Sequence, residues 1–277
     1  MNLKKSYDAI VVGTGAAGGW AAKELAEKGM EILVLEAGPQ LDPAKDFSNH
    51  ARPYEMKYRG FDRPGERERT YPNQWTANEY SKHLYVKDAE HPYTTPEGKP
   101  FRWVRSRFVG GKLLHWGRNA RRMNDFHFRA ADRDGYGENW PIRYADMAPY
   151  YDKVESFIGV AASIENIPHV PDGKYLPPMP LNCGEKIIQK IAPKVGMRVI
   201  TKRAAMRTRS IHGLGRCNYC GGCGRGCAVG GHWNSISDTL PAAMKTGRVA
   251  LRPNSVVLKV LVDENGKARG VAFVPLT

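Results

Sequence analysis

The alternation of apolar and polar positions defines one clear unit at the start of the chain. Residues 7–13 form a short apolar run typical of a buried strand, and residues 31–36 form a second one. Between them, residues 16–28 carry apolar side chains at helical spacing on one face. A strand, a helix and a strand in this order predict a βαβ unit with parallel strands and a right-handed crossover.

The pattern weakens after this unit and returns later. Residues 39–102 are rich in Pro, Gly, Tyr and charge and show little periodicity, which predicts long surface excursions. An amphipathic helix is expected within residues 142–158, beginning near Asp146, because Pro149 is tolerated only in the first turn of a helix. A second helix is expected near residues 184–195.

Strand-like runs return at the end of the chain. They cover residues 249–251, 256–262 and 270–274, with a turn at 263–266 between the last two. Together with the first unit, these runs predict an α/β protein built on a Rossmann-like βαβ domain with long excursions.

A glycine-rich turn joins the first strand to its helix. It has the pattern GxGxxG and consists of Gly13, Thr14, Gly15, Ala16, Ala17 and Gly18. The first glycine permits a tight turn, the second lets the backbone approach a pyrophosphate, and the third allows helix and strand to pack closely. Glu36, at the end of the second strand, can accept hydrogen bonds from ribose hydroxyls. The alternative is a glycine-rich turn without a ligand.

FAD and NAD proteins share this fingerprint. Its position near the N-terminus and the sequence Glu36-Ala37-Gly38 resemble FAD proteins more than NAD dehydrogenases. We therefore expect FAD, bound by the GxGxxG turn together with Glu36 and Ala37.

Composition and charge narrow the class of protein. The chain has 277 residues, of which 42% are hydrophobic and 10% aromatic, which favours a folded core over disorder. No apolar run is long enough for a transmembrane helix, and residues 1–8 lead into a strand without an export signal. The basic residues behind the net charge of +14 are scattered, apart from one cluster that Gly110-Gly111 and apolar positions interrupt: Arg102, Arg105, Arg107, Lys112, Arg118, Arg121 and Arg122. Because this cluster is not a continuous Lys/Arg run, we expect an anionic cofactor or acidic partner rather than nucleic acid.

Four of the five cysteines lie close together: Cys217, Cys220, Cys223 and Cys227. Ferredoxin-type sequences use this C-x2-C-x2-C-x3-C spacing to bind an iron–sulfur cluster, although Ala228 stands where ferredoxins have proline. Zinc is an alternative, but it usually takes two knuckles separated by a longer loop. Disulfides within so short a loop would be strained. The remaining cysteine, Cys183, is expected to be a thiol in the core.

The segment from Val109 to Gly117, which reads VGGKLLHWG, resembles the glucose-methanol-choline (GMC) family of FAD oxidoreductases. In that family a Gly-Gly turn at this point lies along the flavin. The sequence WPIRY at residues 140–144 resembles a stretch near the family's substrate domain, and residues 251–257 resemble the strand that meets the adenine. The resemblance covers nearly the whole chain and implies a GMC fold, with these cofactor contacts: Gly110, Gly111, His115, Trp116 and Val257.

The His-Trp pair of this segment also resembles pyranose oxidases, in which the matching histidine is bonded covalently to the flavin. Bacterial sugar dehydrogenases with a similar pair hold their flavin noncovalently. For His115 we expect an imidazole packed beside the isoalloxazine ring, with the covalent bond as the alternative.

The resemblance also bears on the cysteines. Membrane-linked glucose and fructose dehydrogenases of the GMC type carry a three-iron cluster, whose C-x5-C-x3-C spacing Cys217, Cys223 and Cys227 match. Cys220 is then extra, or completes a four-iron cluster. A cluster beside a flavin passes electrons singly to a cytochrome or quinone, which implies a dehydrogenase. The alternative is an oxygen-dependent pyranose-type oxidase with a structural zinc in this loop, and a third is a nucleic-acid-binding zinc protein.

The cysteine stretch and the following Trp233-Asn234-Ser235 resemble bacterial glucoside 3-dehydrogenases. The implied reaction oxidises a secondary hydroxyl of a sugar or glycoside, at ring C3, to a ketone. Family members carry the histidine that takes the hydroxyl proton near their C-terminus. Nothing in this sequence matches that histidine, so no catalytic residue is assigned.

The same resemblance implies partners. We expect the C-terminal remainder of the protein to supply the base, with a small export or maturation subunit and a cytochrome c acceptor. The expected location is the periplasm or the inner membrane, through a partner subunit, and the cytoplasm is the alternative.

The expected organisation has five segments. They are an FAD-binding βαβ unit (1–45), excursions with the flavin-contacting segment at about 105–120 (46–140), part of a substrate domain (141–210), an iron–sulfur loop (211–235) and a return to the FAD domain (236–277).

Overall fold

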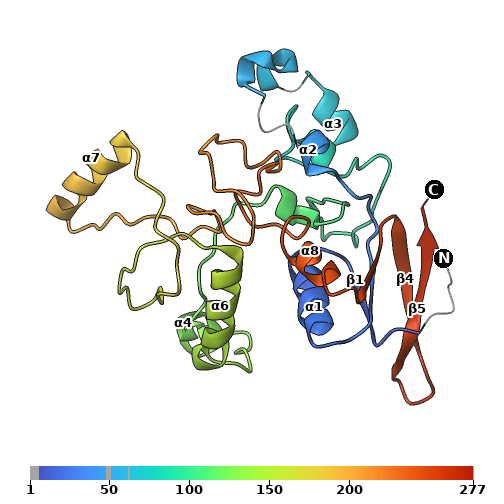
Figure 1. Ribbon diagram of the computed structural model, residues 1–277. Coiled ribbons are helices and arrows are strands. Elements are labelled where there is room, and N and C mark those ends of the chain that lie inside the picture. The colour runs from blue at the N-terminus through green and yellow to red at the C-terminus, as the bar shows by residue number, and fades with distance from the viewer. Residues whose placement is uncertain (1–5, 48–50, 62, 277) are drawn as a thin grey trace. The chain divides into compact units, whose positions relative to one another are not determined.

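The computed structural model describes residues 6–47, 51–61 and 63–276 (Figure 1). Residues 1–5, on which part of the expectation about an export signal rests, lie outside the described residues, as does Thr277. The chain divides into two compact units. The first comprises Met1–Trp116, Cys220–Ala228 and Asn234–Thr277, and the second comprises Gly117–Tyr219 and Val229–Trp233.

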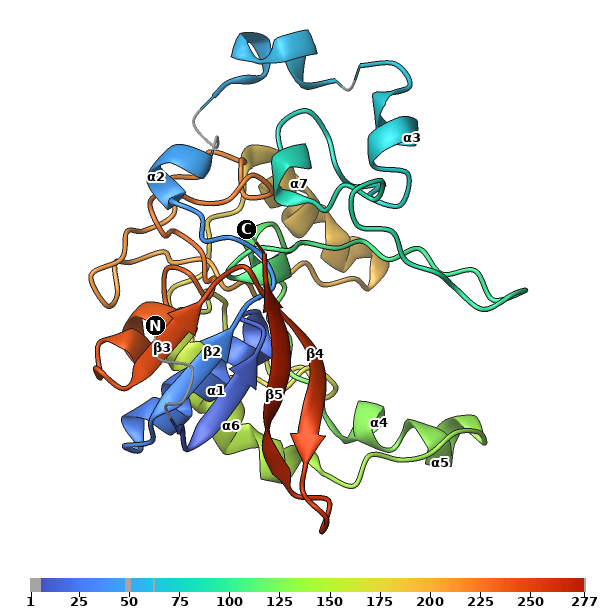
Figure 2. The ribbon, with the colours of Figure 1, turned by 90° about the vertical axis from the view of Figure 1, so that its right-hand side faces the viewer.

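The first unit contains a parallel sheet with the order β1-β2-β3, seen in Figure 2. Its strands are β1 (Ala9–Val12), β2 (Ile32–Leu35) and β3 (Val249–Arg252). Helix α1 (Ala16–Glu27) connects β1 to β2, so the predicted βαβ unit is confirmed. Because β3 comes from the end of the chain, the two predicted parts of the FAD domain lie in one sheet.

Helices α1 and α8 (Thr239–Met244) pack side by side on one face of this sheet (Figure 1). The core between them consists of small and β-branched side chains: Val11, Ala22, Ala26, Ile32, Val34 and Ala243. The helices approach closely at Gly19, where a Cβ atom would lie 2.6 Å from the Thr239 hydroxyl oxygen.

The predicted C-terminal strands are also present. β4 (Ser255–Val262) pairs with β5 (Ala268–Pro275) in an antiparallel hairpin, and the Asp263 amide donates to the Lys267 carbonyl across the predicted turn. Between β2 and β3 the first unit is mostly irregular, as expected. Its short helices are α2 (Pro43–Asp46), η1 (Pro53–Glu55), η2 (Lys57–Gly60), α3 (Glu66–Thr70), η3 (Lys82–Leu84) and η4 (Gly111–Leu114).

A second apolar cluster holds these irregular segments together. It joins residues that are far apart in the sequence: Phe47, Leu84, Val109, Leu114, Ile236 and Leu240. Ala228, at the end of the cysteine segment, packs against the same cluster. Burial of apolar side chains therefore fixes long stretches that have little secondary structure of their own.

The second unit is helical where it is regular. Its helices are α4 (Asp125–Phe128), α5 (Ala130–Asp134), α6 (Tyr144–Ile158), α7 (Cys183–Ile191) and η5 (Ala192–Val195). Both helices that the sequence predicts in this part of the chain are therefore present. No helix among the described residues has the length and hydropathy needed to span a bilayer.

Two expectations about this unit were wrong. Helix α6 begins at Tyr144 rather than near Asp146, because Asp146 acts as a capping acceptor and binds the Arg143 amide at 2.8 Å. Pro149 is consequently the sixth helical residue and lies beyond the first turn. Cys183 is exposed at the first position of α7 and is not a core thiol, because none of the residues of α7 is buried.

Candidate dinucleotide site

The GxGxxG turn adopts a conformation that only glycine tolerates well. Gly13 has φ of +90°, and its amide donates to the Leu35 carbonyl of β2 at 2.7 Å. A Cβ atom at Gly18 would lie 1.9 Å from the Gly13 carbonyl oxygen, so this glycine permits the contact of α1 with the turn. At Gly15, which caps α1, a Cβ atom would meet nothing within 4 Å. The space beside Gly15 is therefore open to a ligand.

Thr14 connects the three parts of the predicted cofactor site. Its amide donates to Glu36 Oε2 at 3.0 Å, and its hydroxyl donates to the same oxygen at 2.5 Å. The hydroxyl also accepts from the Gly110 amide at 2.9 Å. Thr14 is fully buried, so these bonds are shielded from water. They fix the glycine turn, the end of β2 and the Gly-Gly turn relative to one another.

The Glu36 carboxylate is buried but keeps room for one more hydrogen bond. Its Oε1 accepts from the Gly38 amide at 2.9 Å, in addition to the two Thr14 donors on Oε2. A carboxylate has about four acceptor positions. Three of them are used inside the protein, which leaves one for a ribose hydroxyl, as the sequence predicts.

The Gly-Gly turn lies against the glycine-rich turn, although about a hundred residues separate them. Gly110 and Gly111 have φ of +94° and +53°. A Cβ atom at Gly111 would lie 3.6 Å from the Gly15 Cα atom. The structure therefore brings together the two segments in which the sequence predicts cofactor contacts.

His115 follows this turn and is held in a neutral form. Burial, and next the positive charge of Lys112, lower the pKa of His115 from 6.5 to about 4. Its Nε2 atom makes a short hydrogen bond with the Ser106 hydroxyl, and its ring stacks on Tyr85 with centroids 4.3 Å apart. The ring is thus fixed by two neighbours within the first unit.

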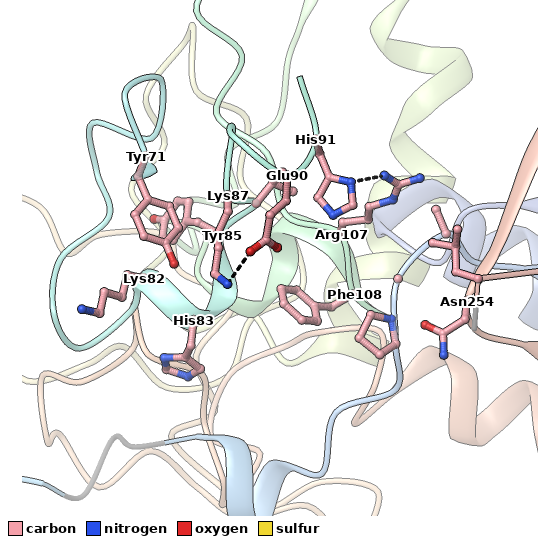
Figure 3. Close-up of a pocket in the computed structure, with 15 residues that line it drawn as sticks. Tyr71, Lys82, His83, Tyr85, Lys87, Glu90, His91, Arg107, Phe108 and Asn254 are labelled. Carbon is pink, nitrogen blue, oxygen red and sulfur yellow. Dashed lines mark hydrogen bonds and ion pairs between the residues drawn. The ribbon is translucent and has the colours of Figure 1, made fainter. Parts of the chain in front are cut away.

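Two adjoining cavities open at the carboxyl end of β2. The first, which we call the Glu36 cavity, has a volume of about 490 Å³ and is lined by Glu36, Ala37, Val86, Trp103, Arg105, Ser106, Arg107 and Lys112. The second, the Tyr71 cavity of Figure 3, measures about 410 Å³ and extends to Asn254 beyond β3. Ala37, Val86 and Arg107 line both cavities. In open α/β sheets, ligands bind at this edge.

Positive charge dominates the wall of the Glu36 cavity. Arg105 is paired with Asp88 at 3.1 Å. Arg107 donates to His91 Nδ1 at 3.0 Å, as Figure 3 shows. Within the described residues, neither Arg107 nor Lys112 forms an ion pair with a carboxylate. An anionic group in this cavity would meet both cations.

The remaining predicted contacts lie in the same unit. Val257 is the third residue of β4 and pairs with Phe273 of β5; it lines neither cavity. The start of β4 is tied to the site, because the Ser255 amide donates to the Glu36 carbonyl at 2.7 Å. Trp116 also belongs to the first unit, where it ends the segment Met1–Trp116.

The four clustered cysteines are divided between the units. Cys217 belongs to the second unit, and Cys220, Cys223 and Cys227 belong to the first. All five cysteines of the chain lie within the described residues, and none forms a disulfide. The Tyr219 amide donates to Cys217 Sγ at 3.4 Å. In the part of the chain that the structure describes, no three His, Cys, Asp or Glu side chains are grouped to hold a metal ion.

The sequence pattern did not single out Trp103 or the linking role of Thr14, and it marked Arg107 only as a member of the basic cluster. Trp103 and Arg107 lie in or beside the irregular excursion, where no periodicity predicts contacts. A hydroxyl residue between the first two glycines, followed by an acidic residue at the end of β2, would have been the signal for Thr14.

Comparison with known proteins agrees with this geometry. The model of the NAD(P)-binding Rossmann-like domain matches residues 11–80, and the predicted fold class is confirmed. The fructose dehydrogenase large subunit of Gluconobacter japonicus is 23% identical over 98% of this chain and 49% of that protein. The gluconate 2-dehydrogenase flavoprotein of Pantoea cypripedii is 25% identical over 99% of this chain and 48% of its own length.

Similarity also extends to an oxidase. Paromamine 6'-oxidase of Streptomyces fradiae is 25% identical over 90% of this chain and 41% of its own length. A solved structure of an FAD-dependent oxidoreductase from Chaetomium thermophilum overlaps 98% of this chain and 42% of its own, with 18% identity and a TM-score of 0.49. The chain spans about half the length of the curated dehydrogenases that it matches.

Proposed function

We propose that this chain is the cofactor-binding part of an FAD-dependent oxidoreductase that oxidises a sugar or polyol hydroxyl. The observation that carries the proposal is the Thr14 link, which joins the glycine-rich turn, Glu36 and the Gly-Gly turn in one buried network. The similar proteins, a fructose dehydrogenase and a gluconate 2-dehydrogenase flavoprotein, support FAD and a hydroxyl substrate.

Bound FAD would supply the two-electron acceptor for the alcohol. The residues of this chain would hold it as follows. The N-terminus of α1 at Gly15 would bind the phosphates, the free acceptor position of Glu36 would bind a ribose hydroxyl, and the Gly-Gly turn would contact the flavin. The His115 imidazole, with a pKa of about 4, would carry no positive charge at physiological pH.

The finer proposal concerns substrate and electron exit. We propose that the substrate is a sugar or glycoside, oxidised at ring C3 to a ketone with release of two protons and two electrons. The electrons would leave singly through an iron–sulfur cluster on Cys217, Cys220, Cys223 and Cys227 to cytochrome c or another acceptor. Their thiol chemistry and spacing support this assignment, and Cys220 is the member that a three-iron cluster would not need.

The proposal extends to partners and location. A further segment of the same protein would supply the base that takes the hydroxyl proton. A small export or maturation subunit and a cytochrome c acceptor would place the enzyme in the periplasm or at the inner membrane.

An oxygen-dependent oxidase with zinc in the cysteine loop is the second candidate, because an oxidase is also among the similar proteins. Metal and sulfide analysis of the anaerobically purified protein separates the two. The first proposal expects iron with acid-labile sulfide, and flavin bands that an alkyl glucoside bleaches when the remaining segment is present. Zinc without iron would refute the dehydrogenase with its cluster and favour the oxidase.

A further inference from the structure

Trp103 is a large aromatic side chain that is half-exposed inside the Glu36 cavity. The residue has 50% of its surface exposed, and it lines a cavity of about 490 Å³. An aromatic ring in that position costs hydrophobic free energy unless a ligand covers it. Because Trp103 lines a cavity, a flat, largely apolar group bound there could cover this ring.

The ring is held in place by its neighbours. The Arg105 guanidinium lies 5.1 Å from the Trp103 ring centre and 4.8 Å from the Tyr93 ring centre. Tyr93 meets Trp103 edge to face, with centroids 5.9 Å apart, and its hydroxyl accepts from the Trp103 amide at 2.8 Å. Arg105 is itself fixed by Asp88. A ring fixed before binding loses little conformational entropy when a ligand stacks on it.

The other groups of the cavity define the rest of the ligand. Glu36 has one acceptor position left for a hydroxyl, as described above. Arg107 and Lys112, which form no ion pair with a carboxylate within the described residues, offer positive charge. A planar ring, a hydroxyl-bearing sugar and an anionic linker are the parts of an adenosine diphosphate group.

We infer that the Glu36 cavity receives the adenosine diphosphate half of the dinucleotide and that the adenine stacks on Trp103. The inference rests on the proposed binding of FAD and assigns the adenine to Trp103, in place of the strand at Val257 that the family resemblance implied and that lines neither cavity. Arg107 and Lys112 attract the diphosphate, whose backbone contacts are at the N-terminus of α1. FMN and riboflavin lack the adenine and do not use this ring.

The test is a set of binding titrations on the protein freed of its cofactor, with ADP, FAD and FMN as probes. Trp103→Ala should weaken binding of both ADP and FAD about 10- to 100-fold, the range for loss of one base–aromatic stack, and leave FMN unchanged. Trp103→Phe should restore affinity to within about threefold, because it keeps a ring at this position. Trp75→Ala is the matched control: Trp75 is 64% exposed but lines neither cavity, so its loss should change nothing.

The outcomes separate this inference from the proposed function. Wild-type protein that binds FAD while Trp103→Ala binds ADP and FAD equally well overturns the role of Trp103 and leaves the flavoprotein intact. Wild-type protein that binds ADP in a Trp103-dependent way but does not bind FAD supports the adenosine site and refutes the flavoenzyme. Binding of neither nucleotide refutes both. Quenching of tryptophan fluorescence by ADP, lost in Trp103→Phe and kept in Trp75→Phe, gives a second readout.

Discussion

At the scale of single residues, two glycines of the GxGxxG turn have separable roles. A methyl group at Gly18 would lie 1.9 Å from the Gly13 carbonyl oxygen, whereas one at Gly15 meets nothing in the protein. We expect Gly18→Ala to destabilise the fold by a few kcal/mol, in the range of about 1–3 for overpacking. Gly15→Ala should lower the free energy of unfolding by less than about 1 kcal/mol, since alanine is only a poorer N-cap than glycine. It should weaken FAD binding, because the methyl group occupies the space of the phosphates. Urea denaturation and FAD titration of both variants check this; a loss of stability in Gly15→Ala as large as in Gly18→Ala would contradict it.

His232 makes the stability of the chain depend on pH. The residue is 1% exposed, its Nδ1 atom donates to the Trp233 carbonyl, and its Nε2 atom has no hydrogen-bond partner among the described residues. Burial is the main reason why the pKa of His232 falls from 6.5 to about 4. Since the unfolded chain binds a proton below about pH 6.5 and the folded chain does not, stability is full above that pH and is lost as the pH falls toward 4.

The expected loss from His232 is about 2 kcal/mol between pH 7 and pH 5. Chemical denaturation at the two pH values measures it. His232→Asn should remove this part of the dependence and leave the part that His115 contributes, because the amide can donate to the same carbonyl and does not titrate. His83→Asn, at an exposed site, is the control and should leave the dependence as it is. An equal dependence in His232→Asn and the wild type would refute the assignment.

At the scale of elements, a buried cation holds helix α6 in the second unit. Arg122 is 4% exposed and donates to both oxygens of Glu155, to Asp152 and to the Tyr144 hydroxyl. We expect Arg122→Met to cost about 3–5 kcal/mol, because it leaves the Glu155 carboxylate buried without its partner. The double variant with Glu155→Gln should recover part of that loss. Arg133→Met, which removes an exposed ion pair, should change stability by less than about 1 kcal/mol, as urea denaturation can show.

Local patterns were enough to predict the strands and the three longest helices of the described residues, but not the short helices, among them α8. The βαβ unit, both longer helices of the second unit and the C-terminal strands follow from periodicity and turn residues within each segment. The starting point of α6 was missed because Asp146 caps the helix from its third position, a choice that depends on side-chain geometry. Cys183 was misplaced because an amphipathic pattern does not reveal whether a partner covers the helix.

The site residues that the sequence predicts are those whose positions depend on local spacing. Gly13, Gly15, Gly18 and Glu36 are found by spacing alone, because turn geometry constrains neighbouring residues. Trp103 reaches the Glu36 cavity through tertiary contacts of an irregular excursion, such as the bond from Gln74 Nε2 to the Trp103 carbonyl. Such contacts leave no periodic signal in the sequence.

At the scale of the whole molecule, the parallel sheet and the glycine turns place a dinucleotide site in the first unit. The net charge of +14 suits an anionic cofactor, and the Glu36 cavity is lined by two cations, Arg107 and Lys112, that form no ion pair with a carboxylate of the described residues. The curated dehydrogenases are about twice as long as this chain, so complete turnover is a property that we propose for the longer assembly.

The most direct test of this account is the FAD content of the protein, measured by releasing the cofactor and quantifying it against protein concentration. We predict one bound FAD per chain after reconstitution with the cofactor. Thr14→Val removes the hydroxyl that joins Glu36 to Gly110 and should lower FAD affinity by about tenfold, while Thr14→Ser should retain it. Protein that binds no FAD, or that binds it equally well in Thr14→Val, would contradict the account.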